Sequence, residues 1–429
     1  MLESRANPLE QAPAEPLEAP AGLRILVVSS DTYPPSRVDV SILFGKELAG
    51  RGHRIDWILQ SEQACASAYA ILWGGSTVWV GATDLGSSLL HRIRKHARGI
   101  LHDLKLFSLM SSQRYDIIEV KDKFISGVFA LIAARRARKR FVFWLSYPFA
   151  EEYILKSRDG TARYPFLYLV RGLAHKFLLY RILLPAADHV FVQSEQMRRD
   201  VAAEGIALDK MTAVPMGINA EMYAGVGERV ERQRIARGER CFLYLGILGK
   251  VRRLDFLLRV LVLVRREIPG VKLYFVGGSE NPSDVEFLRQ EAQRLGIADA
   301  AIFVGQLPQA EALRYVQDAD VCVSPFYPTP ILNSTSPTKL VEYLAMGKAV
   351  VANDHPEQRL VIEQSGGGYC VPYEETAFAD AIVKLLKAPD EAAAMGARGR
   401  RYALAYRSYA RIAESVDAAF RRLAVPARG

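Results

Sequence analysis

The sequence has few cysteines and no signal for export. Its four cysteines, Cys65, Cys241, Cys322 and Cys370, are far apart and form no C-x-x-C pair. That spacing argues against a zinc site and against a disulfide framework, and it fits a reducing cytoplasm. The N-terminus lacks a basic segment followed by an apolar one, so we expect no secretory signal and predict a cytoplasmic protein.

Long uninterrupted apolar runs are also missing. The most apolar candidate, 162–186, contains Arg171, His175, Lys176 and Arg181. A membrane span needs about 20 consecutive apolar residues, so we expect no helix that crosses the bilayer. Attachment to a membrane surface stays open.

The composition is that of a folded, basic protein. Of its 429 residues, 50% are hydrophobic and 24% are charged, which favours two or three domains with large cores. The net charge of +9 suits phosphate-rich ligands, anionic lipids or nucleic acid, and it does not choose among them. Residues 1–21 contain four prolines and are predicted to form a disordered lead-in.

Short apolar strand patterns alternate with helical patterns in two separate units. We place the first unit at 22–217 and the second at 241–400, with a polar linker at 218–240. Residues 401–429 are predicted to form a helix that packs back on the first unit. Continuous apolar strands with helical crossovers indicate a parallel sheet covered on both faces. We therefore predict an α/β protein of two doubly wound, Rossmann-like domains that face a cleft.

The segment SPTKLVEYLAMGKAVVAND predicts a ligand-binding helix followed by a strand. Ser336 is a natural N-cap, and Pro337 suits the first turn. A helix start aimed into a cleft offers free N–H groups to a phosphate. Glu342 lies one turn after Thr338, where its carboxylate would accept hydrogen bonds from the two hydroxyls of a ribose. The alternative is an ordinary capped helix with a solvated glutamate.

This segment resembles the donor-site helix of retaining glycosyltransferases of family 4, which have the GT-B fold. Other segments follow in the family's order over about residues 23–390: LRILVVSSDTYPP, LAGRGHRID, YDIIEV, ADHVFVQSEQMRRDV, VPMGIN, FLYLGILGK, VKLYFVGG and DADVCVSPF. The resemblance implies that the second domain binds a nucleotide sugar and the first an acceptor. It also implies transfer with retention, without a metal ion or another cofactor.

The resemblance implies a donor site in the second domain. The family's basic pair falls on Ile247 and Arg252, so only the second position is basic here. Arg252 is suited to bind phosphate oxygens with two parallel hydrogen bonds; the alternative is a basic solvated loop. The predicted donor-binding residues are Gly246, Lys250, Arg252, Gly277, Ser336, Thr338, Lys339, Leu340 and Glu342.

The sequence departs from the family where the transferred sugar is held. Of two glutamates eight positions apart, Glu342 matches the second, while the first falls on Ser334, beside Asn333. Either this polar pair contacts the sugar hydroxyls or the sugar is held differently, and we favour the former. Arg252, Glu342, Asn333 and Ser334 are therefore the predicted catalytic group.

The first domain departs from the family as well. Its first loop lacks the usual glycine pair, and Arg37 is the candidate that supplies charge there instead. A histidine common in the family is absent after YDIIEV. The remaining candidates at the carboxyl ends of strands are Lys121, Asp122 and Ser146, and the alternative for these is loop packing.

Two basic segments are candidates for binding nucleic acid or a membrane. RRARKR at 135–140 ends a predicted helix without any nucleic-acid-binding signature, so we expect no nucleic-acid partner. HRIRKHARGILHDLKLF at 91–107 interleaves basic and apolar residues at helical spacing, as in a helix that lies on an anionic membrane. The alternative is a plain surface helix.

These observations predict a retaining glycosyltransferase that moves a sugar from a nucleotide diphosphate sugar to a glycan or lipid-linked acceptor. Synthesis of exopolysaccharide or cell-surface glycan, at the inner face of the membrane, is the expected setting. Two alternatives stay open. One is a catalytically silent nucleotide-sugar-binding subunit, and the other is an enzyme of the same fold with different chemistry, such as a nucleotide-sugar epimerase or a phosphorylase.

Overall fold

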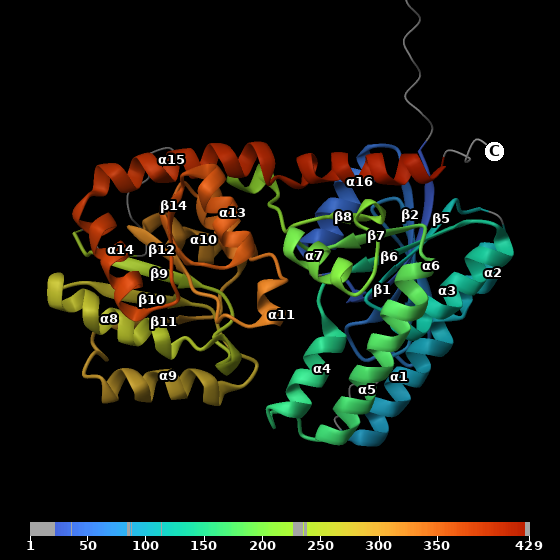
Figure 1. Cartoon of the computed structure of the whole chain (residues 1–429), viewed down its shortest axis with the longest axis horizontal. Coiled ribbons are helices and arrows are strands. Elements are labelled where there is room, and N and C mark those ends of the chain that lie inside the picture. The colour runs from blue at the N-terminus through green and yellow to red at the C-terminus, as the bar shows by residue number, and fades with distance from the viewer. Residues whose placement is uncertain are drawn as a thin grey trace, which may run out of the picture.

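The computed structural model describes residues 22–35, 37–83, 86, 88–112, 114–225, 235 and 238–424. They form two α/β domains that lie side by side (Figure 1). The prediction of two Rossmann-like units is confirmed, since each domain has a mainly parallel sheet with helices on both faces. The lead-in predicted at 1–21 and part of the linker predicted at 218–240 lie outside the described residues.

The N-terminal domain has an eight-stranded sheet in the order β3-β4-β2-β1-β5-β6-β7-β8. Its strands are β1 (Arg24–Tyr33), β2 (Arg54–Ser61), β3 (Tyr69–Trp73), β4 (Ser76–Gly81), β5 (Ile117–Lys121), β6 (Arg140–Leu145), β7 (His189–Val192) and β8 (Met211–Ala213). All pair in parallel except β3, which forms a hairpin with β4 through Gly74 and Gly75. Both glycines have positive φ, as such a tight turn requires. The sequence patterns predicted neither β3 nor the three-residue β8.

Helices cover both faces of this sheet. They are η1 (Asp39–Leu48), α1 (Leu89–Asp103), α2 (Lys105–Ser111), α3 (Phe124–Ala137), α4 (Phe149–Arg158), α5 (Pro165–Phe177), η2 (Leu178–Leu183), α6 (Leu184–Ala186), α7 (Glu195–Ala203), η3 (Leu208–Lys210) and η4 (Ala220–Tyr223). The segment expected to be one helix at 91–107 is two helices, α1 and α2, which meet at Leu104.

The C-terminal domain has a six-stranded parallel sheet in the order β11-β10-β9-β12-β13-β14. Its strands are β9 (Cys241–Leu245), β10 (Lys272–Val276), β11 (Ala301–Gly305), β12 (Val321–Ser324), β13 (Val350–Asn353) and β14 (Gly368–Val371). Its helices are η5 (Lys250–Arg252), α8 (Asp255–Glu267), α9 (Pro282–Arg294), α10 (Gln309–Asp318), α11 (Pro330–Asn333), α12 (Thr338–Ala345), α13 (Pro356–Ser365), α14 (Glu375–Lys387) and α15 (Pro389–Tyr406). Because both faces are covered, the central strands β9, β10, β12 and β13 are mostly buried, whereas the edge strands β11 and β14 are only partly buried.

The last helix, α16 (Tyr409–Ala424), returns to the N-terminal domain (Figure 1). Its buried face, which includes Val416 and Phe420, belongs to the same core as η1 and β1. The His53 imidazole lies 2.7 Å from the Asp417 carboxylate. Where the chain crosses between domains, Ile218 exchanges two backbone hydrogen bonds with Arg407 and Tyr409, each 2.9 Å long. The two crossing segments therefore run together.

Candidate donor site at the carboxyl edge of the second sheet

The α12 helix begins beside the N-terminal domain, but not with the cap that the sequence suggested. Its N-cap is Pro337, which makes no side-chain cap, so the prediction of a Ser336 cap is wrong. The buried Ser336 hydroxyl instead accepts a hydrogen bond of 3.0 Å from the backbone N–H of Met216. The prediction failed because a contact between domains takes the serine oxygen. The first N–H groups of α12, from Thr338 onward, thus lack a side-chain cap.

Lys339 lies over aromatic rings near the start of α12. Its ammonium group donates a hydrogen bond of 2.8 Å to the Tyr244 hydroxyl, and it lies 4.2 Å from the centroid of that ring. It is also 5.0 Å from the centroid of Phe326. Burial, and then the nearby charge of Arg252, hold the pKa of Lys339 well below its usual value. An anion beside it would relieve both effects.

Arg252 reaches the same place from the loop after β9. Its guanidinium carbon lies 5.6 Å from the centroid of Phe326, on the ring that Lys339 also contacts. Within the described part of the chain, neither cation forms an ion pair with a carboxylate. Arg252 is close enough to the N-terminal domain for its charge to lower the pKa of Tyr147 against the stronger effect of burial. The two cations therefore lie on the side of the sheet that faces the first domain.

The two strands near these cations, β9 and β10, are each followed by a glycine, which has no side chain. Gly246 has φ +146°, and a Cβ there would lie 3.4 Å from the Lys339 ammonium. Gly277 has φ +139°, and its Cβ would be 2.0 Å from the Gly246 carbonyl oxygen. The backbones of the two strand ends thus lie very close to each other at this edge of the sheet. Lys250 begins the turn that carries Arg252, and Leu340 is buried in the core under α12.

Glu342 lies one turn into α12, as predicted, with polar neighbours. Its carboxylate accepts a hydrogen bond of 3.0 Å from the Gln309 amide, and it interacts with the Tyr223 hydroxyl. Burial raises the pKa of Glu342, partly offset by Gln309, Lys339 and Tyr223. The carboxylate is therefore partly buried next to a lysine, and it has the acceptor oxygens that a pair of hydroxyls requires.

Asn333 and Ser334 end the short helix α11, which lies beside α7 of the other domain (Figure 1). The Ser334 hydroxyl hydrogen-bonds the Asp200 carboxylate, and its carbonyl accepts a hydrogen bond of 2.7 Å from Ser194. The buried amide oxygen of Asn333 has no hydrogen-bond partner among the described residues. Of the pair predicted to contact the sugar, Asn333 thus offers an unused acceptor, whereas Ser334 already joins the domains.

In the first domain, Lys121 and Arg37 belong to one buried ionic network. The Lys121 ammonium group is fully buried, 2.9 Å from the carboxylate of Asp31 and 3.0 Å from that of Asp39. Arg37 lies 2.9 Å from Asp39. Burial alone would raise the pKa of Asp39, but Lys121 and Arg37 lower it to about 2. This network ties η1 to β1 and β5, and a role of Arg37 and Lys121 in binding the acceptor stays a prediction.

Asp122 and Ser146 form a second buried pair. The Asp122 carboxylate accepts hydrogen bonds from the backbone N–H of Ser146, at 2.8 Å, and from its hydroxyl. Burial raises the pKa of Asp122 to about 6, against the opposing charge of Lys121. Asp122 also has φ +59°, an uncommon conformation for a residue other than glycine. The four N-terminal candidates are therefore brought together at the ends of β5 and β6.

The sequence patterns missed several residues that complete the second-domain site. They are the aromatic side chains under the cations and the polar partners of Glu342: Tyr244, Phe326, Tyr223 and Gln309. Phe326 comes two residues after a strand, a position that could have identified it. Tyr244 lies inside an apolar strand, where nothing in the pattern separates it from the core.

The described residues contain neither a cluster of metal ligands nor a helix that could span a membrane. No group of three or more His, Cys, Asp and Glu side chains there is arranged to hold a metal ion. No helix in the same residues is both long and apolar enough to span a bilayer.

The fold has two α/β domains, and at the start of α12 on the second of them lie two cations, Arg252 and Lys339, that form no ion pair among the described residues. The family model for "Glycosyltransferase Family 4" matches residues 41–222, and that for "Glycosyl transferases group 1" matches residues 239–388. The chain therefore belongs to the family 4 glycosyltransferases, and the predictions of the family and of a glycosyltransferase are confirmed.

Known relatives and structures agree with this assignment. The chain is 25% identical over 296 residues to alpha-monoglucosyldiacylglycerol synthase of Streptococcus pneumoniae, a match of 67% of this chain but only 62% of that protein. It is 24% identical over 405 residues to a GDP-mannose-dependent alpha-(1-6)-phosphatidylinositol monomannoside mannosyltransferase of Mycobacterium tuberculosis, which covers 89% and 94% of the two chains. Its fold matches sucrose-phosphate synthase of Thermosynechococcus elongatus with a TM-score of 0.71, 20% identity, and coverage of 94% and 99%.

Proposed function

We propose that the protein transfers a sugar, with retention of configuration, from a nucleotide diphosphate sugar to a glycan or a lipid-linked acceptor. The observation that carries the proposal is the pair Arg252 and Lys339. Two cations without a carboxylate partner among the described residues stand over one aromatic ring, beside the open start of α12. Such a place favours a dianion, because like charges held together are stabilised by an opposite charge.

The proposal places the donor in one orientation. Its diphosphate lies against Arg252, Lys339 and the first turn of α12, at the glycine-lined edge near Gly246. Its ribose hydroxyls donate to Glu342, one turn along the helix. Its sugar then extends toward Asn333, at the side of the N-terminal domain.

The chemistry rests on charge and position. Departure of the nucleoside diphosphate leaves negative charge, which fixed cations at Arg252 and Lys339 stabilise. Holding the acceptor hydroxyl near the anomeric carbon lowers the entropic part of the barrier. We propose that departure and attack take place on the same face of the sugar. The bond from the anomeric carbon to the diphosphate oxygen breaks, the bond to the acceptor oxygen forms, and the hydroxyl proton passes to the departing diphosphate, so the step requires no metal ion.

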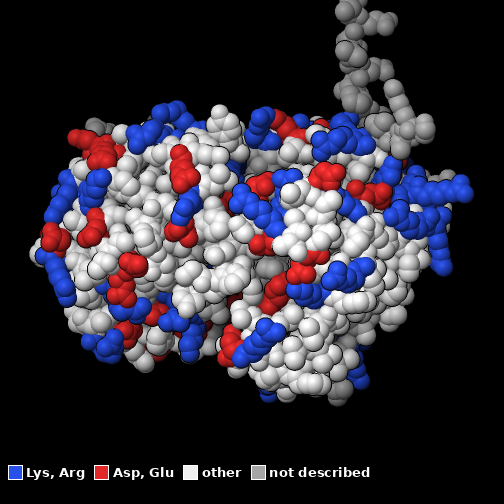
Figure 2. All heavy atoms as spheres, viewed as in Figure 1, with Lys and Arg blue, Asp and Glu red and all other residues white. Residues whose placement is uncertain are grey.

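We also propose peripheral contact with an anionic membrane. The α5 side chains at helical spacing, Phe166, Val170, Leu173 and Phe177, are exposed. They form one apolar stripe, at the end of the domain where Figure 2 shows few charges. The neighbouring α1 exposes Arg94, Lys95 and Arg98. The two helices are neighbours, since burial, and then the charge of Arg171 on α5, lower the pKa of His96 on α1.

An apolar stripe next to basic side chains is typical of a helix that lies on an anionic bilayer. The names of the two relatives refer to a glucosyldiacylglycerol and to a phosphatidylinositol mannoside, which are glycolipids. A lipid-linked acceptor at the inner face of the membrane, in the synthesis of a cell-surface glycan, is therefore the acceptor that we favour.

A thermal-shift screen against UDP-, GDP-, ADP- and dTDP-sugars tests the donor proposal. A ligand at a hundred times its dissociation constant stabilises a protein by about 2.7 kcal/mol. We expect one nucleotide class to raise the melting temperature of the wild type and to fail with Lys339→Met. Donor binding without transfer to any lipid or glycan extract would instead support the catalytically silent subunit. Conversion of the donor without an acceptor would indicate an epimerase, and dependence on inorganic phosphate a phosphorylase.

A further inference from the structure

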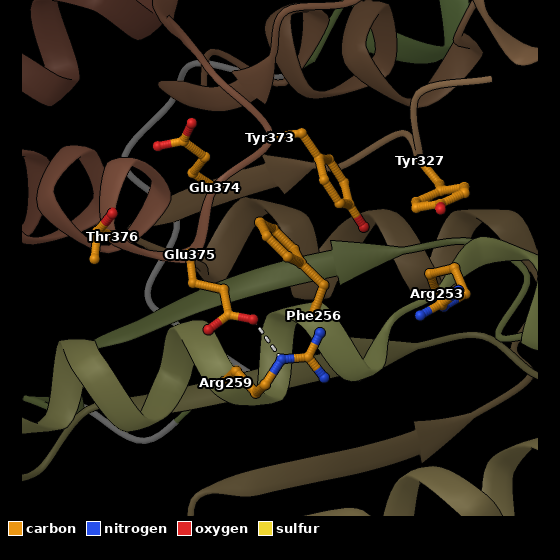
Figure 3. Close-up of a pocket in the computed structure, with 8 residues that line it drawn as sticks. All are labelled: Arg253, Phe256, Arg259, Tyr327, Tyr373, Glu374, Glu375 and Thr376. Carbon is orange, nitrogen blue, oxygen red and sulfur yellow. Dashed lines mark hydrogen bonds and ion pairs between the residues drawn. The ribbon is translucent and has the colours of Figure 1, made fainter. Parts of the chain in front are cut away.

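A surface cavity lies in the C-terminal domain, next to the proposed donor site. It is open to solvent and has a volume of about 490 Å³, between the first turns of α8 and α14 and the loops that follow β12 and β14. Figure 3 shows the rings of Phe256, Tyr327 and Tyr373 gathered there, with Arg253 to one side. Nothing in the proposed donor site uses these side chains.

The donor site and the cavity are lined by residues that are consecutive in the sequence. Arg252 lies over Phe326 in the donor site, whereas Arg253 lies over Tyr327, with its guanidinium carbon 5.2 Å from the ring centroid. Arg253 has φ +50°, a left-handed conformation, at the C-cap of η5. Two consecutive arginines are thus matched by two consecutive aromatic residues, and only the second pair lines the cavity.

The cavity walls combine apolar faces with free polar groups. Phe256 and Tyr373 stack at 4.2 Å, and Tyr327 meets Tyr373 edge to face at 5.8 Å. Tyr327 remains 37% exposed. The Tyr373 hydroxyl oxygen is buried and has no hydrogen-bond partner in the described part of the chain. A buried hydroxyl without a partner indicates a missing ligand group or water.

Charge decides what kind of ligand fits. Arg259 is neutralised by Asp255, at 2.8 Å, and by Glu375. Arg253 is only 3.7 Å from Asp255, and Glu374 adds a further carboxylate at the rim. With both signs present in similar number, neither an anion nor a cation is strongly favoured. A neutral ligand with an apolar face and several hydroxyl groups matches the walls best, because aromatic faces cover its C–H surface while charged groups bind its hydroxyls.

We propose that this cavity binds a neutral pyranose unit, with its C–H face on Tyr327 and its hydroxyl groups on Tyr373 and Arg253. If the proposed function holds, this unit belongs to the acceptor glycan, beyond the point of transfer. The cavity would then select acceptors that already carry a sugar over those that do not. The binding of the pyranose itself does not depend on the identity of the donor.

Saturation-transfer NMR tests this directly, with the methyl α-glycosides of glucose, mannose and galactose as probes and with UDP and GDP present to occupy the donor site. We expect at least one glycoside to bind the wild type. Tyr327→Ala should weaken that binding by about ten-fold or more, since it removes the exposed ring. Tyr373→Phe, which keeps the stacked ring, tests the hydroxyl alone and should also weaken it. Tyr406→Ala, an exposed tyrosine on α15, is the matched control and should change nothing.

Nucleotide binding, followed in the same samples, separates this proposal from the donor site. UDP or GDP binding should be equal in the wild type and in all three variants. If no glycoside binds the wild type, or if Tyr327→Ala binds it as well as the wild type, the proposal is overturned. Binding of inorganic phosphate or tetramethylammonium at Tyr327 in preference to the glycosides would overturn it too. If the wild type binds a glycoside but neither UDP nor GDP, the donor site is wrong and the pyranose result stands. If Tyr327→Ala or Tyr373→Phe loses nucleotide binding, the cavity is not separate from the donor site and the proposal is overturned.

Discussion

Lys339 and Arg252 stand over the same phenyl ring, 5.0 Å and 5.6 Å from the centroid of Phe326. They come from different elements, the α12 helix and the turn after β9, and their charges repel. Tyr244 holds Lys339 in place with a hydrogen bond of 2.8 Å. The arrangement is unfavourable when empty and favourable around a dianion, which is the electrostatic basis of the proposed donor site.

Removing a polar partner of the donor should reduce transfer without unfolding the protein. Arg252→Ala and Glu342→Ala each remove a charge-assisted hydrogen bond, worth about 1.5–3 kcal/mol. We expect kcat/KM to fall about ten- to a hundred-fold in each variant. Arg266→Ala, on the exposed side of α8, is the matched control and should retain full activity. Near-normal rates in both site variants would refute the assignment.

Donor binding should depend on the protonation of Lys339. Burial and Arg252 hold the pKa of Lys339 well below its usual value, so this lysine loses its proton at a lower pH than an exposed lysine does. A bound diphosphate raises that pKa and draws in a proton, so affinity should fall as the pH rises. Calorimetry in buffers of different ionisation enthalpy measures the uptake. It should disappear in Lys339→Met, and an unchanged value in that variant would contradict the account.

The sequence was enough to predict the two α/β domains and the position of Glu342 on α12. Apolar strand runs and helix signals are local, and they persist because both sheets are buried on both faces. Ser336 could not be assigned correctly, since its hydroxyl bonds Met216, more than a hundred residues earlier. The sequence also gives no sign that Lys121 pairs with Asp31 and Asp39, and its predicted place at the cleft stays a prediction. Contacts between distant segments decide such cases, and no local pattern records them.

A buried carboxylate should make the first domain sensitive to pH. Both carboxylate oxygens of Glu119, on β5, are buried without a hydrogen-bond partner in the described part of the chain, and burial raises its pKa to about 8. The pKa of Glu119 is higher in the folded protein than its value of 4.5 in the unfolded chain. The folded protein therefore loses stability as the pH rises between these two pKa values. The expected slope is about 1.4 kcal/mol per pH unit in that window.

The variant Glu119→Gln isolates this effect. Denaturant unfolding between about pH 5 and pH 8 should show a weaker pH dependence in Glu119→Gln than in the wild type, because the amide has no charge to bury. Asp39, with its pKa of about 2, acts in the opposite sense and only below this window. Parallel pH profiles for wild type and variant would show that Glu119 does not control the stability.

The apolar stripe on α5 should govern attachment to membranes. Phe166→Ser together with Phe177→Ser removes two exposed rings and should weaken binding to vesicles that contain phosphatidylglycerol, as measured by co-sedimentation. Leu72→Ser, at an equally exposed position on β3, is the control. Transfer to a water-soluble acceptor should be unaffected in all variants. If the double variant sediments with vesicles like the wild type, α5 is not the attachment surface.

The central claim is the location of the diphosphate. A crystal structure with the nucleoside diphosphate that stabilises the protein most in the thermal-shift screen tests it directly. We predict phosphate oxygens within hydrogen-bond distance of the Arg252 guanidinium, the Lys339 ammonium and the first N–H groups of α12. A diphosphate bound elsewhere, with Arg252 and Lys339 still free of it, would contradict the account.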